Sequence, residues 1–200
     1  MRRPRTRRWA VAGVLVALLG SCASDPQQRV ATAPPKQQDD VCAIFDQRPD
    51  WRVATVASAA RWGAPVEVQM AIIWRESSFR ATARPPQTYS FGIPTGRLSS
   101  AFGYSQAIDG TWAWYREESG NARADRTDFA DAADFVGWYM AKTQSTNGLD
   151  MYDAYNQYLA YHEGHTGFRR GSWREKAWLQ RAAGQVAYQA QRYREQLSTC

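Results

Sequence analysis

Apolar residues recur at helical spacing along most of the chain after residue 50, and this pattern limits the possible folds more than any other feature. Side chains three or four positions apart share one face of a helix, whereas strands need strict alternation. No stretch of useful length alternates in that way. The pattern predicts an all-α fold, and the length of residues 41–200 suits a single domain.

Capping residues and helix breakers divide this domain into seven expected helices. The first is expected to end at Gly63 and to bury Val53 and Val56. The sixth is expected to open with a capping box of Ser172 and Glu175. The expected segments are residues 50–62, 65–77, 105–118, 127–140, 150–162, a segment that begins at 172, and 186–197.

The segment from Arg84 to Ser100 has no helical periodicity and contains three prolines and two glycines. A loop of more than about 12 residues in a compact domain is usually functional or disordered. We therefore expect one long irregular loop over about residues 84–100, placed to face a substrate.

The first 21 residues have the layout of an export signal. Five arginines precede an apolar run from Val11 to Leu19, which is shorter than the roughly 20 residues of a membrane-spanning helix. The small residues directly before Cys22 are similar to the lipobox of bacterial lipoproteins. We expect residues 1–21 to be a lipoprotein signal peptide and residues 22–40 to be the lipidated Cys22 and a flexible tether. The alternative is an ordinary signal peptide followed by an incidental cysteine.

The residue after that cysteine is Ala23 and not aspartate. In a Gram-negative host, the sorting habit of lipoproteins then implies the outer membrane, facing the periplasm. The sequence thus predicts a protein of the bacterial cell envelope that is bound to a membrane through its lipid.

The charge distribution argues against a nucleic-acid partner. All 19 acidic residues follow Cys22, but five of the 25 basic residues precede it, which leaves 20 basic against 19 acidic residues. Nucleic-acid binding needs a persistent basic patch. The two histidines, His162 and His165, and the remaining cysteines lack the spacing of a metal site, so no metal is expected.

Cys42 and Cys200 stand at the two ends of the expected domain. In an oxidising compartment an even number of cysteines indicates disulfide pairing, so these two predict a bond that joins the ends. Two free thiols are the alternative. Apolar periodicity after Phe168 predicts helices that close the domain and hold Cys200 near Cys42.

The chain contains nine tryptophans, all but Trp9 in the expected domain, and ten tyrosines, which are many for its size. Flat aromatic faces beside polar groups suit sugar rings, but core packing is the simpler explanation for any single tryptophan. Several are too closely spaced to face one core, among them Trp112, Trp114, Trp173 and Trp178. Only their number favours a carbohydrate ligand.

Glu76 is the acidic residue in the most unusual place. It lies beside an apolar helix face that includes Ile73 and Trp74, and at the carboxyl end of that helix, where unpaired carbonyls disfavour negative charge. Both features raise the pKa of a carboxyl group. A carboxylic acid that stays protonated near neutral pH can protonate the leaving oxygen of a glycosidic bond. Spacing alone does not separate this role from that of a surface glutamate.

Three motifs in order resemble those of a known family. They are Glu76-Ser77-Ser78-Phe79, Gly103-Tyr104-Ser105-Gln106 and Ala160-Tyr161-His162-Glu163-Gly164. The soluble-type (SLT-domain) lytic transglycosylases have Glu-Ser-x-Phe, Gly-Leu-Met-Gln and Ala-Tyr-Asn-x-Gly in the same order. The resemblance spans about residues 53–168. It implies a lysozyme-like fold and cleavage of the β-1,4 bond between N-acetylmuramic acid (MurNAc) and N-acetylglucosamine (GlcNAc) in peptidoglycan.

The resemblance also implies roles for single residues. Glu76 would be the catalytic acid and later the base, and Tyr161 would orient it. Ser77 would support the substrate or Glu76, and Gln106 would bind a sugar. The bond would break without water and leave 1,6-anhydroMurNAc ends, and no cofactor would take part.

Glu163, within the third motif, leaves an alternative open. If it faces Glu76 across a cleft with a water between them, the same bond can be hydrolysed, as in a muramidase. Otherwise Glu163 is a solvated residue at a helix end. A lipoprotein that only binds glycan is a further alternative. His162 stands where the family has asparagine, and Tyr104 and Ser105 stand where it has an apolar pair.

Overall fold

The computed structural model of the protein describes residues 33–200. The expected signal peptide and the lipidation of Cys22 lie outside these residues. Within the described part, every helix is too short or too polar to cross a membrane.

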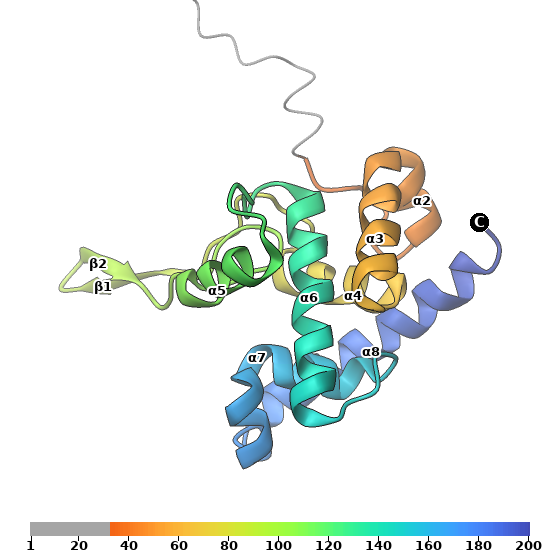
Figure 1. The fold of residues 1–200 in the computed structure, drawn as a ribbon. Helices are drawn as coiled ribbons and strands as arrows, with labels where there is room; N and C mark the ends of the chain where they lie inside the picture. Colours follow the sequence, from red (N-terminus) through yellow and green to blue (C-terminus); the bar gives the residue numbers. More distant parts are fainter. Residues whose placement is uncertain (1–32) are drawn as a thin grey trace, which may run out of the picture. The chain divides into compact units, whose positions relative to one another are not determined.

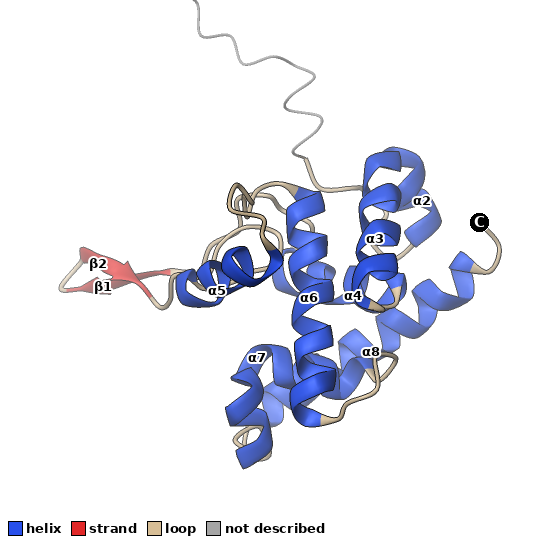
Figure 2. Cartoon of the chain, viewed as in Figure 1, coloured by secondary structure: helices blue, strands red, loops and turns tan. Residues whose placement is uncertain are grey.

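Seven helices and one two-stranded sheet make up the described part (Figures 1 and 2). The helices are α2 (Val41–Gln47), α3 (Pro49–Trp62), α4 (Val66–Ser77), α5 (Asp109–Ser119), α6 (Phe129–Asn147), α7 (Ala154–Arg170) and α8 (Ala177–Leu197). The strands are β1 (Gln87–Ser90) and β2 (Ile93–Arg97). The predicted fold class, a mostly helical lysozyme-like domain, is confirmed.

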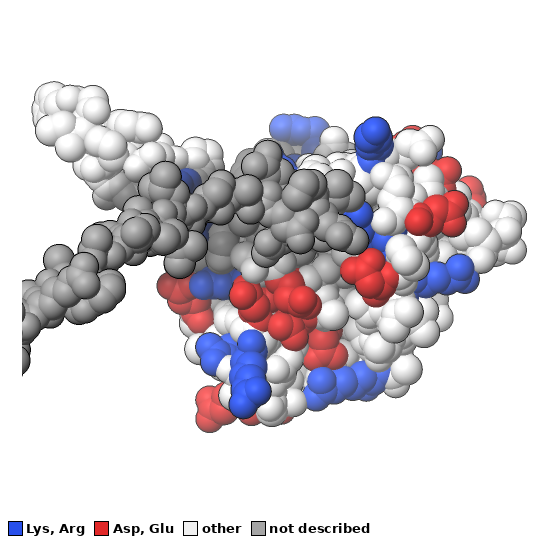
Figure 3. Space-filling view, turned by 90° about the horizontal axis from the view of Figure 1, so that it is seen from above, with Lys and Arg blue, Asp and Glu red and all other residues white. Residues whose placement is uncertain are grey.

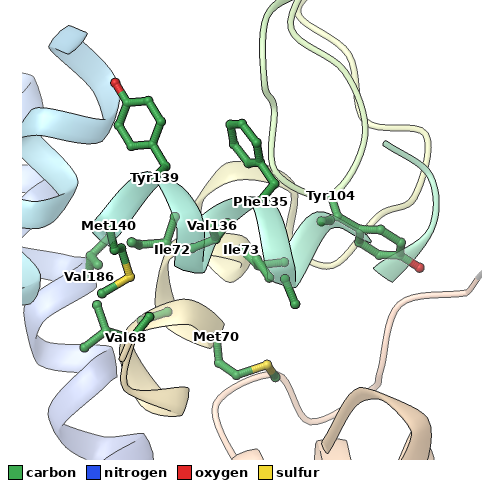
Figure 4. Close-up of a cluster of buried hydrophobic side chains, with 14 of the residues drawn as sticks. Val68, Met70, Ile72, Ile73, Tyr104, Phe135, Val136, Tyr139, Met140 and Val186 are labelled. Atoms are coloured by element: carbon green, nitrogen blue, oxygen red, sulfur yellow. The ribbon is translucent and has the colours of Figure 1, made fainter. Parts of the chain in front are cut away.

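The central helix is α6, which packs against α3, α4, α5 and α7, while α8 packs against α4 and α7 (Figure 1). All residues from 135 to 140 are buried, as expected of a helix surrounded by others. Below α6, Val68 of α4 meets Met140 and Val186, from α6 and α8 (Figure 4). The core residues all lie between positions 41 and 193, so residues 33–200 form a body with its own core.

The predicted core face of the first helix is wrong. Val53 and Val56 are 69% and 51% exposed, and α3 instead buries Trp51, Thr55 and Ser58. The tryptophan decides the face because its large ring stacks on Phe129, with centroids 3.9 Å apart. The two hydroxyls tolerate burial because each donates to a backbone carbonyl.

The predicted sixth and seventh helices are one helix, α8, and the capping box of Ser172 and Glu175 is wrong. The hydroxyl of Ser172 donates to Glu163 instead of to a helix amide, and the helix begins only after Lys176. The third helix also begins later than expected, at Asp109. The short helix α2 is too brief to show a period and was not predicted.

The predicted irregular loop contains a β-hairpin. β1 and β2 pair antiparallel, and the turn residues Phe91 and Gly92 both have positive φ, as in a type I′ turn. The strands project away from the helices and bury no face, so the sequence shows no alternation. Residues 87–96 carry no charge, and the hairpin forms the uncharged lobe at the left of Figure 3.

Residues 33–40, expected to belong to a flexible tether, instead lie against α8. Tyr193 donates its hydroxyl proton to the carbonyl of Gln38, and Gln196 donates to the carbonyl of Asp39 over 3.1 Å. A disulfide joins Cys42 and Cys200, whose Cα atoms are 6.0 Å apart. The first and last described segments are thus fastened together.

Candidate active site

A cavity of about 470 Å³ lies between α4, α6, α7 and the segment that leads from the hairpin into α5. It brings together residues from all three sequence motifs. Its lining consists of Glu76, Ser99, Ala101, Gln106, Ala107, Ile108, Thr111, Phe135, Tyr139, Tyr161, His162, Glu163 and Gly164. The volume is in the usual range for a small-ligand site.

Glu76 sits in the last turn of α4 and is partly exposed, because it opens on this cavity. Burial of its carboxyl group raises the pKa from 4.5 to about 7. A hydrogen bond from Tyr158 and the nearby positive charge of Arg75 act in the opposite direction and lower it. The balance leaves a carboxyl group that holds and releases a proton near neutral pH.

The backbone turns sharply directly after Glu76. Ser78 and Phe79 have φ of 50° and 57°, a left-handed conformation that is unfavourable for residues other than glycine. Phe79 is fully buried and packs on Trp51, which fixes the turn in the core. The aromatic anchor thus holds the end of α4, and Glu76 with it, in place.

The second motif is tied to the loop after α4. Gly103 has φ of 79°, and a Cβ atom there would lie 2.0 Å from the carbonyl oxygen of Arg126, so only glycine fits. Gln106, also left-handed, donates from Nε2 to the carbonyls of Ala83 and Gly103 over 2.9 and 2.8 Å. Its amide oxygen is not used in these hydrogen bonds and remains an acceptor at the cavity wall.

The two unusual residues of the second motif face away from the cavity lining. Tyr104 is buried and packs edge-on against Trp51 and Phe129, which is the role of an apolar side chain. Ser105 is also buried, and its carbonyl accepts the hydroxyl proton of Tyr161 over 2.6 Å.

Arg126 packs against the second motif and holds this wall of the cavity in place. Arg126 donates to the carbonyls of Ser100 and Ala107 over 3.2 and 2.9 Å, and it pairs with Asp109 at 2.8 Å. Its guanidinium group also lies over the ring of Phe102. One side chain therefore fixes both ends of the segment between the hairpin and α5.

The third motif lies where α7 is interrupted. Gly164 has φ of 74° and ψ of 158°, so the helix breaks there and resumes, whereas the sequence suggested an end. Tyr158 and Tyr161 lie three residues apart on one side of the first half. Hydrogen bonding by Tyr158 lowers the pKa of Glu76, while Tyr161 donates to the carbonyl of Ser105 over 2.6 Å. Tyr161, which the resemblance implies would orient Glu76, thus bonds to Ser105, and Tyr158 is the tyrosine that affects the Glu76 carboxyl group through a hydrogen bond.

Glu163 lines the cavity but is not the solvated residue that the sequence suggested. Its side chain is only 4% exposed, and Lys176 places Nζ 2.8 Å from both of its carboxylate oxygens. Ser172 and His162 also contact this carboxylate. Burial alone would raise the pKa of Glu163, but these hydrogen bonds bring it below its usual value.

Ser77 lies apart from the cavity lining. It is buried, and its hydroxyl donates to the carbonyl of Ile73 one turn earlier in α4. Its own carbonyl accepts from the guanidinium of Arg80 over 3.0 Å. Its contacts support the end of α4 and not a bound ligand.

The described tryptophans contribute to the core more than to the cavity, whose lining contains none of them. Trp112 and Trp138 are buried, in agreement with core packing. Trp178 is half exposed and packs edge-on against His162, with ring centroids 5.0 Å apart, so it lies next to the lining. Within residues 33–200, no group of three or more His, Cys, Asp and Glu side chains is placed to hold a metal ion.

Sequence reasoning missed Tyr158 and Lys176. A signal for the tyrosine exists, since it stands one helical turn before Tyr161 in the third motif. No local signal exists for Lys176, because it reaches Glu163 only through the turn that joins α7 to α8.

The chain matches a protein-family model. The model described as a transglycosylase SLT domain covers residues 10–200 of the chain. A comparison with curated proteins found no match.

Proposed function

The chain belongs to the transglycosylase SLT family, whose members are lyases that cleave peptidoglycan, and on this premise we propose that Glu76 is its catalytic acid and base. The bond we propose as the target is the β-1,4 bond between MurNAc and GlcNAc. The observation that supports this most is the place of the Glu76 carboxyl group, which opens on the cavity shared by all three motifs and whose burial raises its pKa to about 7.

In the first step Glu76 donates its proton to the oxygen of the glycosidic bond. Burial keeps a large fraction of this carboxyl group protonated near pH 7, and general acid catalysis is most effective when the pKa lies near the working pH. The C1–O4 bond then breaks, the GlcNAc side leaves as an alcohol, and positive charge develops at C1 of MurNAc.

In the second step Glu76, now a carboxylate, takes the proton of the MurNAc 6-hydroxyl. The oxygen of that hydroxyl forms a bond to C1, and the product ends in a 1,6-anhydro ring without the addition of water. The hydrogen bond from Tyr158 and the charge of Arg75 stabilise the ionised form of Glu76 between the two steps.

Gln106 and Tyr161 complete the proposed site in different ways. The free amide oxygen of Gln106 suits a sugar hydroxyl. Tyr161 ties α7 to the second motif through Ser105, so we assign it the positioning of the cavity wall. Ser77 is assigned the support of Glu76 through the end of α4, not contact with the substrate.

The contacts of Glu163 favour the lyase over a muramidase. Hydrolysis would need a second carboxylate that activates a water. Glu163 lines the same cavity, but Lys176, Ser172 and His162 occupy its oxygens, and its pKa is lowered, so it is a weak base. The single acid and base, Glu76, needs no such partner.

We further propose that lipid on Cys22 holds the enzyme at a membrane of the cell envelope. The motif before Cys22 supports this, and the envelope is where the family's substrate lies. Incorporation of radiolabelled palmitate into the full chain, absent in Cys22→Ser, is the expected result; equal labelling of both chains would contradict it.

The assignment of Glu76 is tested by the release of soluble muropeptides from purified sacculi. Glu76→Gln keeps the shape of the side chain but cannot donate the proton, and we expect a loss of about 10³-fold or more. Glu117→Gln is the matched control, because Glu117 is exposed on α5 and away from the cavity. Residual activity of Glu76→Gln within tenfold of wild type would exclude Glu76 as the acid.

A further inference from the structure

His162, Glu163 and Lys176 form a connected chain of contacts at the cavity wall. Lys176 stands directly before the first residue of α8, and its ammonium group donates to both oxygens of Glu163. The hydroxyl of Ser172, in the preceding turn, donates to the same carboxylate. A cationic donor and a hydroxyl thus hold Glu163 ionised although its side chain is buried.

The ionised carboxylate fixes the tautomer of the neighbouring histidine. Nδ1 of His162 lies 3.2 Å from Oε1 of Glu163. A carboxylate only accepts hydrogen bonds, so Nδ1 must carry the proton. In the neutral ring, Nε2 then has a free lone pair and is an acceptor.

The orientation of the ring is fixed as well. Trp178 packs edge-on against His162, and Glu163 holds the ring through Nδ1. His162 lines the cavity, which also contains Glu76. An oriented acceptor at the wall of a sugar-sized cavity suits a ligand that carries hydroxyl donors.

We propose that His162 accepts a hydrogen bond from a sugar hydroxyl of the glycan, and that Glu163 and Lys176 are positioning residues that hold its ring and tautomer. The inference rests on the proposed function only in that it places glycan in the same cavity. It gives the carboxylate of Glu163 a role without proton transfer to substrate or water. It also gives the start of α8 a function at the site, since Lys176 directly precedes the first residue of that helix.

The tautomer is measured by ¹⁵N NMR of the imidazole rings in the chain from Ala23 onward, which contains the whole described body. The protein has only two histidines, His162 and His165, so both spin systems are resolved. We expect the Nδ1–H form for His162 in the wild type, retention in Glu163→Gln, which keeps an acceptor, and loss in Glu163→Leu. An Nε2–H ring in the wild type, or the same form in Glu163→Leu, would overturn the positioning role.

Glycan binding is measured by calorimetry with the GlcNAc hexasaccharide in a Glu76→Gln background, where turnover does not interfere. His162→Ala is expected to lower the affinity about tenfold, which corresponds to the loss of one hydrogen bond. His162→Asn is expected to restore part of the affinity. Glu163→Leu is expected to lower the affinity by a similar factor, measured well below the melting temperature of the variant so that only folded protein is compared. Affinity of His162→Ala within twofold of the background would refute the contact.

A matched lysine separates the positioning role from a general loss of charge. Lys142 pairs with Glu118, is exposed to a similar extent as Lys176 and lies outside the cavity lining. Lys176→Met should weaken hexasaccharide binding severalfold, and Lys142→Met should leave it unchanged. Equal losses in both would contradict the proposal. Since the binding assay needs no catalysis, its failure is distinct from a failure of the proposed lyase activity.

Discussion

The side chain of Tyr158, from α7, interacts with the carboxyl group of Glu76, in the last turn of α4, and its hydrogen bonding lowers the pKa of that carboxyl group. The bond stabilises the ionised form of Glu76, whereas burial stabilises the protonated form, and burial is the larger effect. Tyr158 itself stays protonated, because burial and the neighbouring carboxylate raise its pKa. The acid strength of Glu76 is therefore set by burial, which raises its pKa, and by the contacts with Tyr158 and Arg75, which lower it.

Tyr158→Phe removes one of these contacts. The pKa of Glu76 should rise above about 7, since the lost hydrogen bond favoured the carboxylate. Activity that needs protonated Glu76 falls as the pH rises through this pKa, so the alkaline limb of kcat/KM should move to higher pH while kcat falls. The pH profile of muropeptide release measures both. Tyr161→Phe is the control, because Tyr161 bonds to a backbone carbonyl, and an equal shift there would contradict the account.

Glu76→Gln should change the pH dependence of stability. The folded protein keeps the Glu76 proton up to about pH 7, but the unfolded chain releases it near pH 4.5. Between these values the folded state binds more protons, so wild-type stability falls as the pH rises, by at most roughly 3 kcal/mol. Glutamine does not titrate, so the variant should match the wild type near pH 4 and exceed it at pH 8. Urea unfolding at the two pH values tests this, and a constant difference would contradict it.

Gly103→Ala should disrupt the second motif. The new Cβ would clash with the carbonyl oxygen of Arg126, and the left-handed backbone at residue 103 disfavours alanine. We therefore expect a loss of roughly 2 to 4 kcal/mol in unfolding free energy. Activity should also fall, because Gln106 is held by the carbonyl of Gly103. Gly110→Ala is the matched control: it lies in α5 with no atom within 4 Å of the new Cβ. Its stability should stay the same or rise by up to about 1 kcal/mol. Chemical denaturation and muropeptide release measure both effects, and equal losses in the two variants would contradict this explanation.

Reduction of the Cys42–Cys200 bond should destabilise the whole domain. The bond closes a loop across a sequence separation of 158 residues, so its loss frees most of the unfolded chain, at a cost of roughly 2 to 4 kcal/mol. The midpoint of urea unfolding should fall on addition of reductant. The Cys42→Ala/Cys200→Ala variant should show the lower midpoint with and without reductant. An unchanged midpoint in reduced wild type would mean that the contacts of residues 33–40 with α8 suffice.

Local sequence signals predicted the helices well where a large apolar residue and a capping group agree. α6 begins after Asp128, which caps it, and α4 ends at the turn after Glu76, close to the predicted limits. The face of α3 was not predictable from spacing, because Trp51 outweighs two valines only once Phe129 is opposite it. The hairpin strands show no alternation of apolar and polar residues in the sequence, because both faces of the hairpin are exposed.

In the candidate site, too, the sequence predicted some features and not others. The motifs identified Glu76, Gln106 and Tyr161, which line one cavity in the structure. They did not show that Tyr158 is the residue that lowers the pKa of Glu76, or that Glu163 forms an ion pair with Lys176, directly before α8. Both facts depend on how α7 packs on its neighbours, and such contacts between distant segments are not encoded in local spacing.

If Glu76 closes a 1,6-anhydro ring and no water is added, the reaction products show it directly. Purified sacculi are digested in H₂¹⁸O with the chain from Ala23 onward, and the muropeptide ends are analysed by mass spectrometry. We expect 1,6-anhydroMurNAc ends without ¹⁸O in the wild type and none in Glu76→Gln. Reducing ends that carry one ¹⁸O would contradict it and would mean that water is the nucleophile.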